Sequence, residues 1–213
     1  GIDANVMNLD LGFSIDNLQK CDLLFMGGAQ DRQQKIVSDD LSKEKAKVLK
    51  EMIENDVPGL YICGAYQFLG KYYKEADGTI IPGLNIILDL YTENPGVKHK
   101  RLIGNIVVES RMKTLVGFEN HGGRTYLGKG VKPLGKVKVG FGNNGEDKTE
   151  GAVYKNSIGT YLHGPILPKN PHFADHLIKL ALEKKYKKSL ILSPLDDSLE
   201  LQAHEAILKK LTQ

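Results

Sequence analysis

The sequence contains no tryptophan and only two cysteines, Cys21 and Cys63. Two cysteines cannot build the disulfide framework of a small secreted domain, and a chain of 213 residues can bury a core without one. We therefore expect a reducing, cytoplasmic environment. Long apolar runs are missing as well, since none approaches the roughly 20 residues that cross a bilayer. The sequence predicts no transmembrane segment.

A strong charge of either sign is also absent. The formal net charge is +3 at pH 7, and the lysines are spread along the chain apart from one cluster at residues 184–188. Basic side chains are favoured at helix C-termini, so we interpret this cluster as the solvated end of a helix. The charge pattern argues against nucleic acid as a partner. Hydrophobic and charged contents of 41% and 26% are typical of a globular protein, and we expect one domain over residues 1–213.

The order of short apolar segments, glycine turns and helical patterns predicts the fold class. In the first half we expect strands at 4–9, 22–26 (buried on both faces) and 59–62, and helices at 41–55, with Ser42 as N-cap, and 65–72. Further on we expect strands at 104–109, 115–119, 135–139, 152–154 and 156–162, and helices at 171–185 and 198–211. Together these predict a three-layer α/β domain with a mostly parallel sheet and an antiparallel β excursion, with sites at the carboxyl ends of strands.

Cys63 is placed as a nucleophile would be. It follows the apolar strand 59–62 and precedes a helix that opens with Gly64, and small residues there permit the sharp turn of a nucleophile elbow. Backbone N–H groups at such a turn lower the pKa of a thiol and can stabilise an oxyanion. The alternative is that Cys63 is a small buried hydrophobe, which this position alone would favour.

His163 closes the last expected strand, so its side chain should emerge at the same sheet edge as Cys63. A nucleophile and its base require that arrangement, although a lone histidine is more often structural. Gly28 follows a third strand end, where its N–H could complete an oxyanion hole with that of Gly64. Glycines are common in turns, so this last signal is weak.

Three motifs together resemble a known family. They are YICGAYQFLG at 61–70, GFENHGGRT at 117–125 and GTYLHGP at 159–165, preceded by GGAQD at 27–31. In this order they resemble the cobyric-acid-synthase-like glutamine amidotransferases. The resemblance covers about residues 22–170 and implies a class I glutamine-amidotransferase fold, flavodoxin-like, that hydrolyses L-glutamine to glutamate and ammonia. Relatives carry a strand and a helix ahead of Gly1, and we expect this chain to lack them.

The resemblance also assigns roles to single residues. Cys63 matches the nucleophile and His163 the general base. Arg101 matches an arginine that binds glutamine, and a guanidinium can hold both oxygens of the α-carboxylate; without the family, a surface cation would be preferred. The remaining substrate-binding positions, which could instead only organise their loops, are Gln67, Asn120, His121 and Gly122.

Two positions depart from the family pattern. Ala65 replaces a second glycine of the elbow, which a slightly wider turn can absorb. Pro165 occupies the position where triad glutaminases usually carry an acid two residues after the histidine. Without that carboxylate the imidazole loses control of its tautomer and stabilisation of its charged form. We therefore expect a partner protein to supply the missing acid.

Within the family, the motifs are most similar to those of separate glutaminase subunits that serve a Mur-ligase-like (MurT-like) synthetase. That resemblance implies a heterodimer at the inner face of the bacterial membrane, in which the partner uses ATP and Mg to amidate D-glutamate of lipid II to D-isoglutamine. This chain has no Gly-rich loop ending in Lys-Ser or Lys-Thr, and we expect it to hold no cofactor or metal. The alternatives are amidation of cobyric acid or another cofactor, a non-catalytic subunit that stabilises its partner, and a cysteine peptidase.

Overall fold

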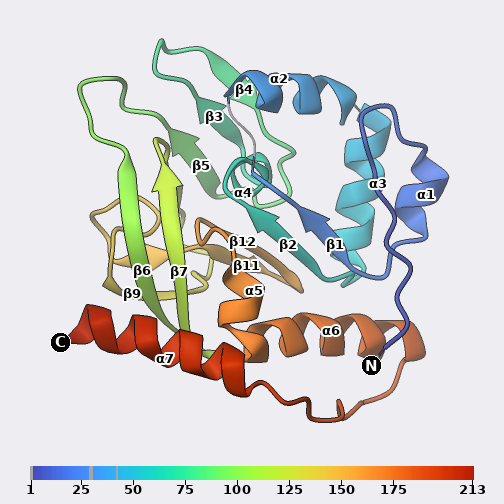
Figure 1. Ribbon diagram of the computed structural model, residues 1–213. Helices are drawn as coiled ribbons and strands as arrows, with labels where there is room; N and C mark the ends of the chain where they lie inside the picture. The colour runs from blue at the N-terminus through green and yellow to red at the C-terminus, as the bar shows by residue number, and fades with distance from the viewer. Residues whose placement is uncertain (1, 29–30, 42) are drawn as a thin grey trace.

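A computed structural model describes residues 2–28, 31–41 and 43–213. Its central sheet has the order β1-β2-β12-β11, formed by Leu24–Met26, Gly59–Ile62, Ser157–Thr160 and Ala152–Tyr154 (Figure 1). β1 and β12 both pair with β2 in parallel, and β11 pairs with β12 antiparallel. The carboxyl ends of the three parallel strands therefore meet at one edge of the sheet, where sites of α/β proteins form.

Two further four-stranded sheets complete the β structure. One is antiparallel throughout and has the order β10-β9-β6-β7, formed by Thr149–Glu150, Gly135–Val139, Leu102–Ser110 and Lys113–His121. The other has the order β4-β3-β5-β8, formed by Ile80–Pro82, Tyr72–Lys74, Leu90–Glu93 and Arg124–Leu127. The expected α/β class is confirmed, with parallel pairing concentrated in the central sheet. The antiparallel part is larger than the sequence indicated.

Seven helices are described, and they surround the central sheet. They are α1 (Ile15–Gln19), α2 (Asp31–Asp40), α3 (Lys43–Glu54), α4 (Gly64–Phe68), α5 (Ile166–Lys169), α6 (Pro171–Tyr186) and α7 (Ser198–Thr212). α3 lies beside β1 and β2, α5 and α6 lie beneath β12, and α7 runs along the lower ends of β6 and β7 (Figure 1). Across the described residues, no helix combines the length and apolarity of a membrane span.

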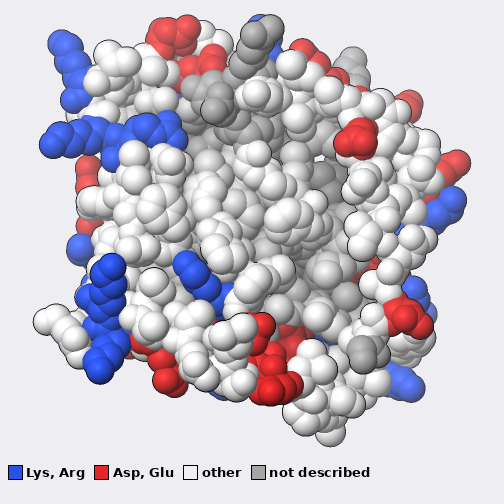
Figure 2. Space-filling view, in the orientation of Figure 1, with Lys and Arg blue, Asp and Glu red and all other residues white. Residues whose placement is uncertain are grey.

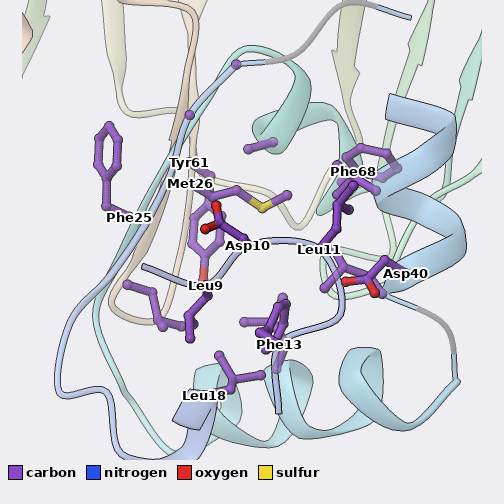
Figure 3. A pocket seen from close by; sticks show the side chains of 17 residues that line it. Leu9, Asp10, Leu11, Phe13, Leu18, Phe25, Met26, Asp40, Tyr61 and Phe68 are labelled. Carbon is purple, nitrogen blue, oxygen red and sulfur yellow. The ribbon is translucent and has the colours of Figure 1, made fainter. Parts of the chain in front are cut away.

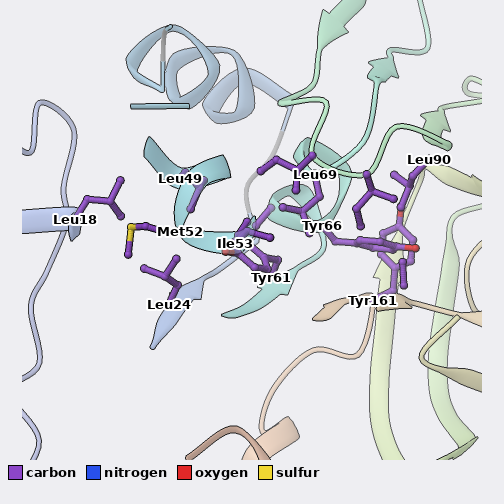
Figure 4. Close-up of a cluster of buried hydrophobic side chains, with 14 residues drawn as sticks. Leu18, Leu24, Leu49, Met52, Ile53, Tyr61, Tyr66, Leu69, Leu90 and Tyr161 are labelled. Carbon is purple, nitrogen blue, oxygen red and sulfur yellow. The ribbon is translucent and has the colours of Figure 1, made fainter. Parts of the chain in front are cut away.

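The central sheet buries apolar side chains on both faces, which is why β2 reads as a continuous apolar run. Tyr61 points into a cluster with side chains of α1, α3 and α4, which Figure 4 shows from Leu18 to Tyr161. Leu60 and Ile62 point into a second cluster with strands β6, β7 and β9 and helices α5 and α6. The third layer is therefore partly a sheet and not helices alone.

Several expected elements differ from the structure. Residues 4–9 form no strand, because a short apolar pattern does not by itself supply a neighbouring strand for the backbone N–H and C=O groups. The strand expected at 22–26 is only three residues long, and Phe25 on it is 66% exposed and not buried. The helix expected at 65–72 ends at Phe68. Two residues later the backbone of Gly70 passes so close to Leu90 that a Cβ at Gly70 would lie 2.6 Å from the carbonyl oxygen of Leu90. The proposed N-cap Ser42 lies outside the described residues.

An apolar cavity of about 420 Å³ lies between the N-terminal segment, β1 and helices α2 and α3. Figure 3 shows Phe13, Met26, Tyr61 and Phe68 among its lining side chains. Gly28 lines one end, whereas the side chains proposed for catalysis do not take part. The cavity therefore lies behind the candidate site. On the face drawn in Figure 2, uncharged side chains fill the centre and many Lys and Arg side chains lie toward the left edge.

Candidate active site

Cys63 forms a strained elbow between β2 and α4. Its backbone adopts φ 52° and ψ −108°, a conformation that costs a side-chain-bearing residue roughly 1–3 kcal/mol. Its N–H donates to the carbonyl oxygen of Thr160 at 2.9 Å, and its carbonyl accepts from the N–H of Gln67 at 3.0 Å. These bonds hold the elbow from both sides. The turn predicted from the small residues after β2 is therefore present.

Gly28 brings its backbone against this elbow. A Cβ at Gly28 would lie 3.2 Å from Cβ of Cys63 and 3.9 Å from its Sγ, so a larger residue would press on the nucleophile. Gly64 is buried and begins α4 on the other side of the turn. The structure thus brings both glycines next to Cys63. Their N–H groups remain the candidate oxyanion donors.

His163 lies beside Phe118 of β7, to which it is joined by an isolated antiparallel bridge. The backbone N–H of His163 donates to the carbonyl oxygen of Phe118 at 2.8 Å, and the ring Nδ1 lies 3.2 Å from the same oxygen. A carbonyl can only accept, so Nδ1 carries the hydrogen in this contact and Nε2 is left as the basic atom. A backbone carbonyl therefore orients this imidazole from within the chain.

Burial lowers the pKa of His163 below its usual value, and electrostatic interactions with His121 and Arg101 lower it further. The carbonyl contacts with Tyr161 and Phe118 oppose this shift. His163 is consequently neutral at neutral pH, the state that a general base requires.

The pairing of β2 with β12 brings Cys63 and His163 to one sheet edge. Ile62 and Thr160 are partners in the parallel register, and each is the last residue of its strand. Cys63 follows one strand directly, and His163 follows the other after two buried residues. The strand register therefore places both side chains at the same edge of the sheet, as expected from two apolar strands that each lead to a reactive residue.

Arg101 and Asn120 form a polar cluster at the start of β6 and the end of β7. Nε of Arg101 donates to Oδ1 of Asn120 at 3.0 Å, and Nη2 donates to its carbonyl oxygen at 3.1 Å. Gly122 leaves room for the guanidinium, because a Cβ there would lie 3.4 Å from Nη1. Both polar side chains are exposed. Three of the predicted substrate-binding residues therefore lie together at the surface.

Gln67 and His121, by contrast, point inward. Gln67 is 4% exposed and its Nε2 donates to the hydroxyl of Tyr161 at 3.0 Å. His121 is 1% exposed and its ring stacks on that of Tyr161. Successive residues on a strand face opposite sides, so Asn120 points to solvent where His121 points to the core. These two residues brace the site from behind and do not line its open side.

Tyr161 is the residue that sequence reasoning missed. Besides the bond from Gln67, its hydroxyl shares a hydrogen bond of 2.7 Å with that of Thr125, which in turn bonds to Thr92 at 2.7 Å. Burial raises the pKa of Tyr161, and nearby Cys63 raises it further. In the sequence, Tyr161 looked like an ordinary strand residue between Thr160 and a leucine, and nothing marked its hydroxyl as a junction.

The arrangement can carry out acyl transfer. It combines a strained thiol, a neutral imidazole, backbone donors for an oxyanion and a guanidinium for a carboxylate. An amide whose carbon skeleton also bears a carboxylate suits such a site. Within residues 2–28, 31–41 and 43–213, no group of three or more His, Cys, Asp or Glu side chains is placed to hold a metal ion.

Comparison with known proteins agrees with this chemistry. Residues 3–171 match the family of CobB/CobQ-like glutamine amidotransferase domains. The chain is 49% identical to subunit GatD of the glutamine-hydrolyzing lipid II isoglutaminyl synthase of Staphylococcus aureus, over 98% of this chain and 83% of that protein. For the same subunit of Streptococcus pneumoniae the identity is 44%, over 86% of this chain and 70% of that protein.

More distant relatives share the domain alone. A probable cobyric acid synthase of Methanothermobacter thermautotrophicus is 32% identical over 86% of this chain, which covers only 37% of that protein. Among solved structures, PurLQS of Thermotoga maritima has a similar fold, with a TM-score of 0.52, 13% identity, and coverage of 78% of this chain and 80% of that one.

Fold and sequence thus place the chain among the class I glutamine amidotransferases. The chain belongs to the CobB/CobQ-like family of these enzymes.

Proposed function

We propose that Cys63 and His163 hydrolyse L-glutamine to glutamate and ammonia. Sγ of Cys63 bonds to the side-chain amide carbon while Nε2 of His163 takes the thiol proton. The tetrahedral oxyanion is held by the N–H groups of Gly28 and Gly64. His163 returns the proton to the departing nitrogen as the C–N bond breaks, giving ammonia and a thioester. His163 then deprotonates a water molecule that attacks the thioester and releases glutamate.

Glutamine is oriented by the polar cluster at the ends of β6 and β7. The guanidinium of Arg101 binds the α-carboxylate, and Asn120 positions the guanidinium and contacts the substrate. Gly122 keeps this space open. Gln67 and His121 support the site indirectly, because their contacts with Tyr161 hold α4 and the loop between β7 and β8 in place.

The ammonia passes to a Mur-ligase-like (MurT-like) synthetase subunit in a heterodimer. That partner holds ATP and Mg and amidates D-glutamate of lipid II to D-isoglutamine, at the cytoplasmic face of the membrane. The observation that carries this proposal is the identity of 49% and 44% to two GatD subunits of lipid II isoglutaminyl synthases. The chain is less similar to cobyric acid synthases and covers about a third of their length. This similarity supports a second candidate function, amidation of a cofactor precursor.

The partner also completes the catalytic residues. Position 165 is a proline, and the carbonyl of Phe118 that orients His163 carries no full negative charge. A carboxylate contributed by the synthetase would stabilise the imidazolium as it forms. Glutamine turnover that is equally fast in the isolated chain and in the complex would exclude this role.

The test uses 6-diazo-5-oxo-L-norleucine, which alkylates glutaminase cysteines, together with affinity purification from the native host. Labelling at Cys63 that disappears in Cys63→Ala supports the enzyme, and absence of labelling in the complex supports a non-catalytic subunit. Mass spectrometry of the co-purified protein then decides the pathway. A Mur-ligase-like protein supports lipid II amidation, and a cobalamin-pathway enzyme contradicts it.

A further inference from the structure

Glu150 is a fully buried carboxylate that the proposed mechanism does not use. It ends the short strand β10, which belongs to the antiparallel sheet and not to the central one. Its Oε1 accepts from the hydroxyl of Thr160 at 2.6 Å and from the backbone N–H of Tyr161 at 2.8 Å. One carboxylate oxygen therefore ties the second sheet to the carboxyl end of β12.

Thr160 carries this contact on to the catalytic pair. Its Oγ1 accepts from the N–H of Leu162 at 3.1 Å, which leaves its single hydroxyl hydrogen for Glu150. Its carbonyl oxygen accepts from the N–H of Cys63 at 2.9 Å. His163 is the next residue after Leu162. The segment 160–162 therefore touches the nucleophile at one end and leads into the base at the other.

From this geometry we propose that Glu150 is a positioning residue for glutamine hydrolysis. Its carboxylate fixes segment 160–162 so that Cys63 and His163 keep their relative placement while the thioester forms and breaks down. The proposal rests on the proposed roles of Cys63 and His163. It adds a residue that touches neither glutamine nor the reacting atoms and acts through Thr160.

The electrostatic surroundings make this tie depend on pH. Burial raises the pKa of Glu150 to about 7, while its bonds from Thr160 and Tyr161 lower it and the charge of Glu119 raises it. The titratable groups that face it from the packed elements are Glu119 of β7 and Tyr66 of α4. Neither is a cation, so at neutral pH the charge is held mainly by hydrogen bonds.

Protonation weakens the tie. Hydrogen bonds to an ionised acceptor are roughly twice as strong as neutral ones. The second oxygen, Oε2, is buried with no hydrogen-bond partner among the described residues, so a proton placed there gains no compensating bond. Segment 160–162 is therefore held firmly above about pH 7 and more loosely below it.

The test measures kcat and KM for L-glutamine from pH 5.5 to 8.5, using the complex with its synthetase partner. In the wild type, kcat should fall in a partial step near pH 7, before the further loss caused by protonation of His163 at lower pH. Glu150→Gln should lower kcat several-fold at pH 8, leave KM within about twofold and lack the step near pH 7. These magnitudes correspond to the loss of about one charge-assisted hydrogen bond.

A second pair of variants tests the same tie if Glu150→Gln does not fold. Thr160→Val removes the hydroxyl and should lower kcat as much as Glu150→Gln does. Thr160→Ser keeps the hydroxyl and should keep kcat close to the wild-type value. Glu119→Gln is the comparison variant, because Glu119 is equally buried but accepts from the N–H groups of Phe141 and Gly142. It should keep the step and move it to lower pH, because the charge of Glu119 is one cause of the raised pKa of Glu150.

The outcomes separate the two proposals. If folded Glu150→Gln and Thr160→Val retain the wild-type kcat and its pH profile, Glu150 has a structural role only and the inference is wrong. If the wild-type complex neither hydrolyses glutamine nor is labelled at Cys63, the proposed function itself fails.

Discussion

The ring of His121 stacks on the ring of Tyr161, with centroids 3.6 Å apart and planes within 6° of parallel. The hydroxyl of the same Tyr161 accepts from Gln67 on the elbow helix. The side chain of Tyr161 therefore connects the end of β7, the helix α4 after Cys63 and the segment between β12 and His163. Substitutions can therefore perturb this inner support and the exposed residues Arg101 and Asn120 separately.

Removing the stack should disturb glutamine binding. His121→Ala is expected to lower the free energy of unfolding by at least about 1 kcal/mol, since stacked aromatic pairs contribute roughly 0.5–1.5 kcal/mol beyond their buried area. KM for glutamine should rise, because Asn120 and Gly122 flank this residue. His121→Phe keeps a ring in place and should retain most of both properties. Urea denaturation and steady-state kinetics measure the two effects, and equal KM values in both variants would contradict the bracing role.

The strain at Cys63 predicts an order of stability among inactive variants. Cys63→Ala keeps a Cβ at φ 52°, whereas Cys63→Gly has no steric penalty there. Cys63→Gly should therefore be more stable than Cys63→Ala by about 1 kcal/mol, despite the greater flexibility of the unfolded glycine chain. Thermal denaturation of the two proteins provides the comparison. A more stable alanine variant would show that the elbow is not strained in solution.

Gly28 and Gly27 form a matched pair. A Cβ at Gly28 would lie 3.2 Å from Cβ of Cys63, whereas one at Gly27 would meet no described atom within 4 Å. Gly28→Ala keeps the backbone N–H, but its Cβ would press on Cys63 and displace that N–H from the oxyanion, so kcat should fall by up to about a hundredfold, the typical effect of a lost oxyanion donor. Gly27→Ala should leave kcat nearly unchanged. Similar losses in both variants would mean that the loop matters as a whole and that Gly28 is not a specific donor.

Arg101 should act on substrate affinity and not on chemistry. Lysine keeps the charge but cannot reproduce the two-pronged contact. Arg101→Lys should raise KM for glutamine about tenfold, which corresponds to about 1.4 kcal/mol, with kcat within about twofold. Arg111→Lys changes an exposed arginine between β6 and β7 and serves as the control. If kcat fell in Arg101→Lys while KM stayed constant, binding of the α-carboxylate would be the wrong role.

Glu150 gives a prediction for stability against pH. Its pKa is raised from 4.5 to about 7 in the folded protein, so between these values the folded state keeps a proton that the unfolded chain has lost. The contribution of Glu150 to the free energy of unfolding is therefore greatest below pH 4.5 and is lost as pH rises to about 7. The loss over this range is roughly 3 kcal/mol. The stability of the wild type relative to Glu150→Gln should fall over this range. Urea denaturation at pH 5 and pH 8 measures it, and a constant difference would contradict the raised pKa.

The sequence predicted those features of the fold that depend on a local pattern of residues. The continuous apolar run at 59–62 predicted the bounds and full burial of β2, and the small residues after it predicted the elbow at Cys63. The last strand was expected at 156–162 and ends at Thr160, but His163 still follows it at the sheet edge that carries Cys63. The strand, the turn and the position of His163 all depend on residues that are close together in the sequence, and such residues can be read directly from it.

Contacts between distant segments were not predictable. Whether His121 faces the core depends on the register of β7 against β6, and the bond from Thr160 to Glu150 depends on how two sheets pack. The segment at 4–9 was expected as a strand but forms none in the described structure, because a strand requires a neighbouring strand that a short local pattern cannot reveal. The sequence therefore indicated the candidate nucleophile and base, but not the contacts through Tyr161 and Glu150 that hold the segments around them.

The bond between Gln67 and Tyr161 joins residues 94 positions apart in the chain. Contacts of such long range form late, after the loop between them has closed. During synthesis Cys63 leaves the ribosome long before the strand that carries His163, and translation proceeds at about 5–20 residues per second. For several seconds the nascent chain therefore contains Cys63 without His163. Under the proposed mechanism, such a chain does not hydrolyse glutamine until β12 has joined the sheet.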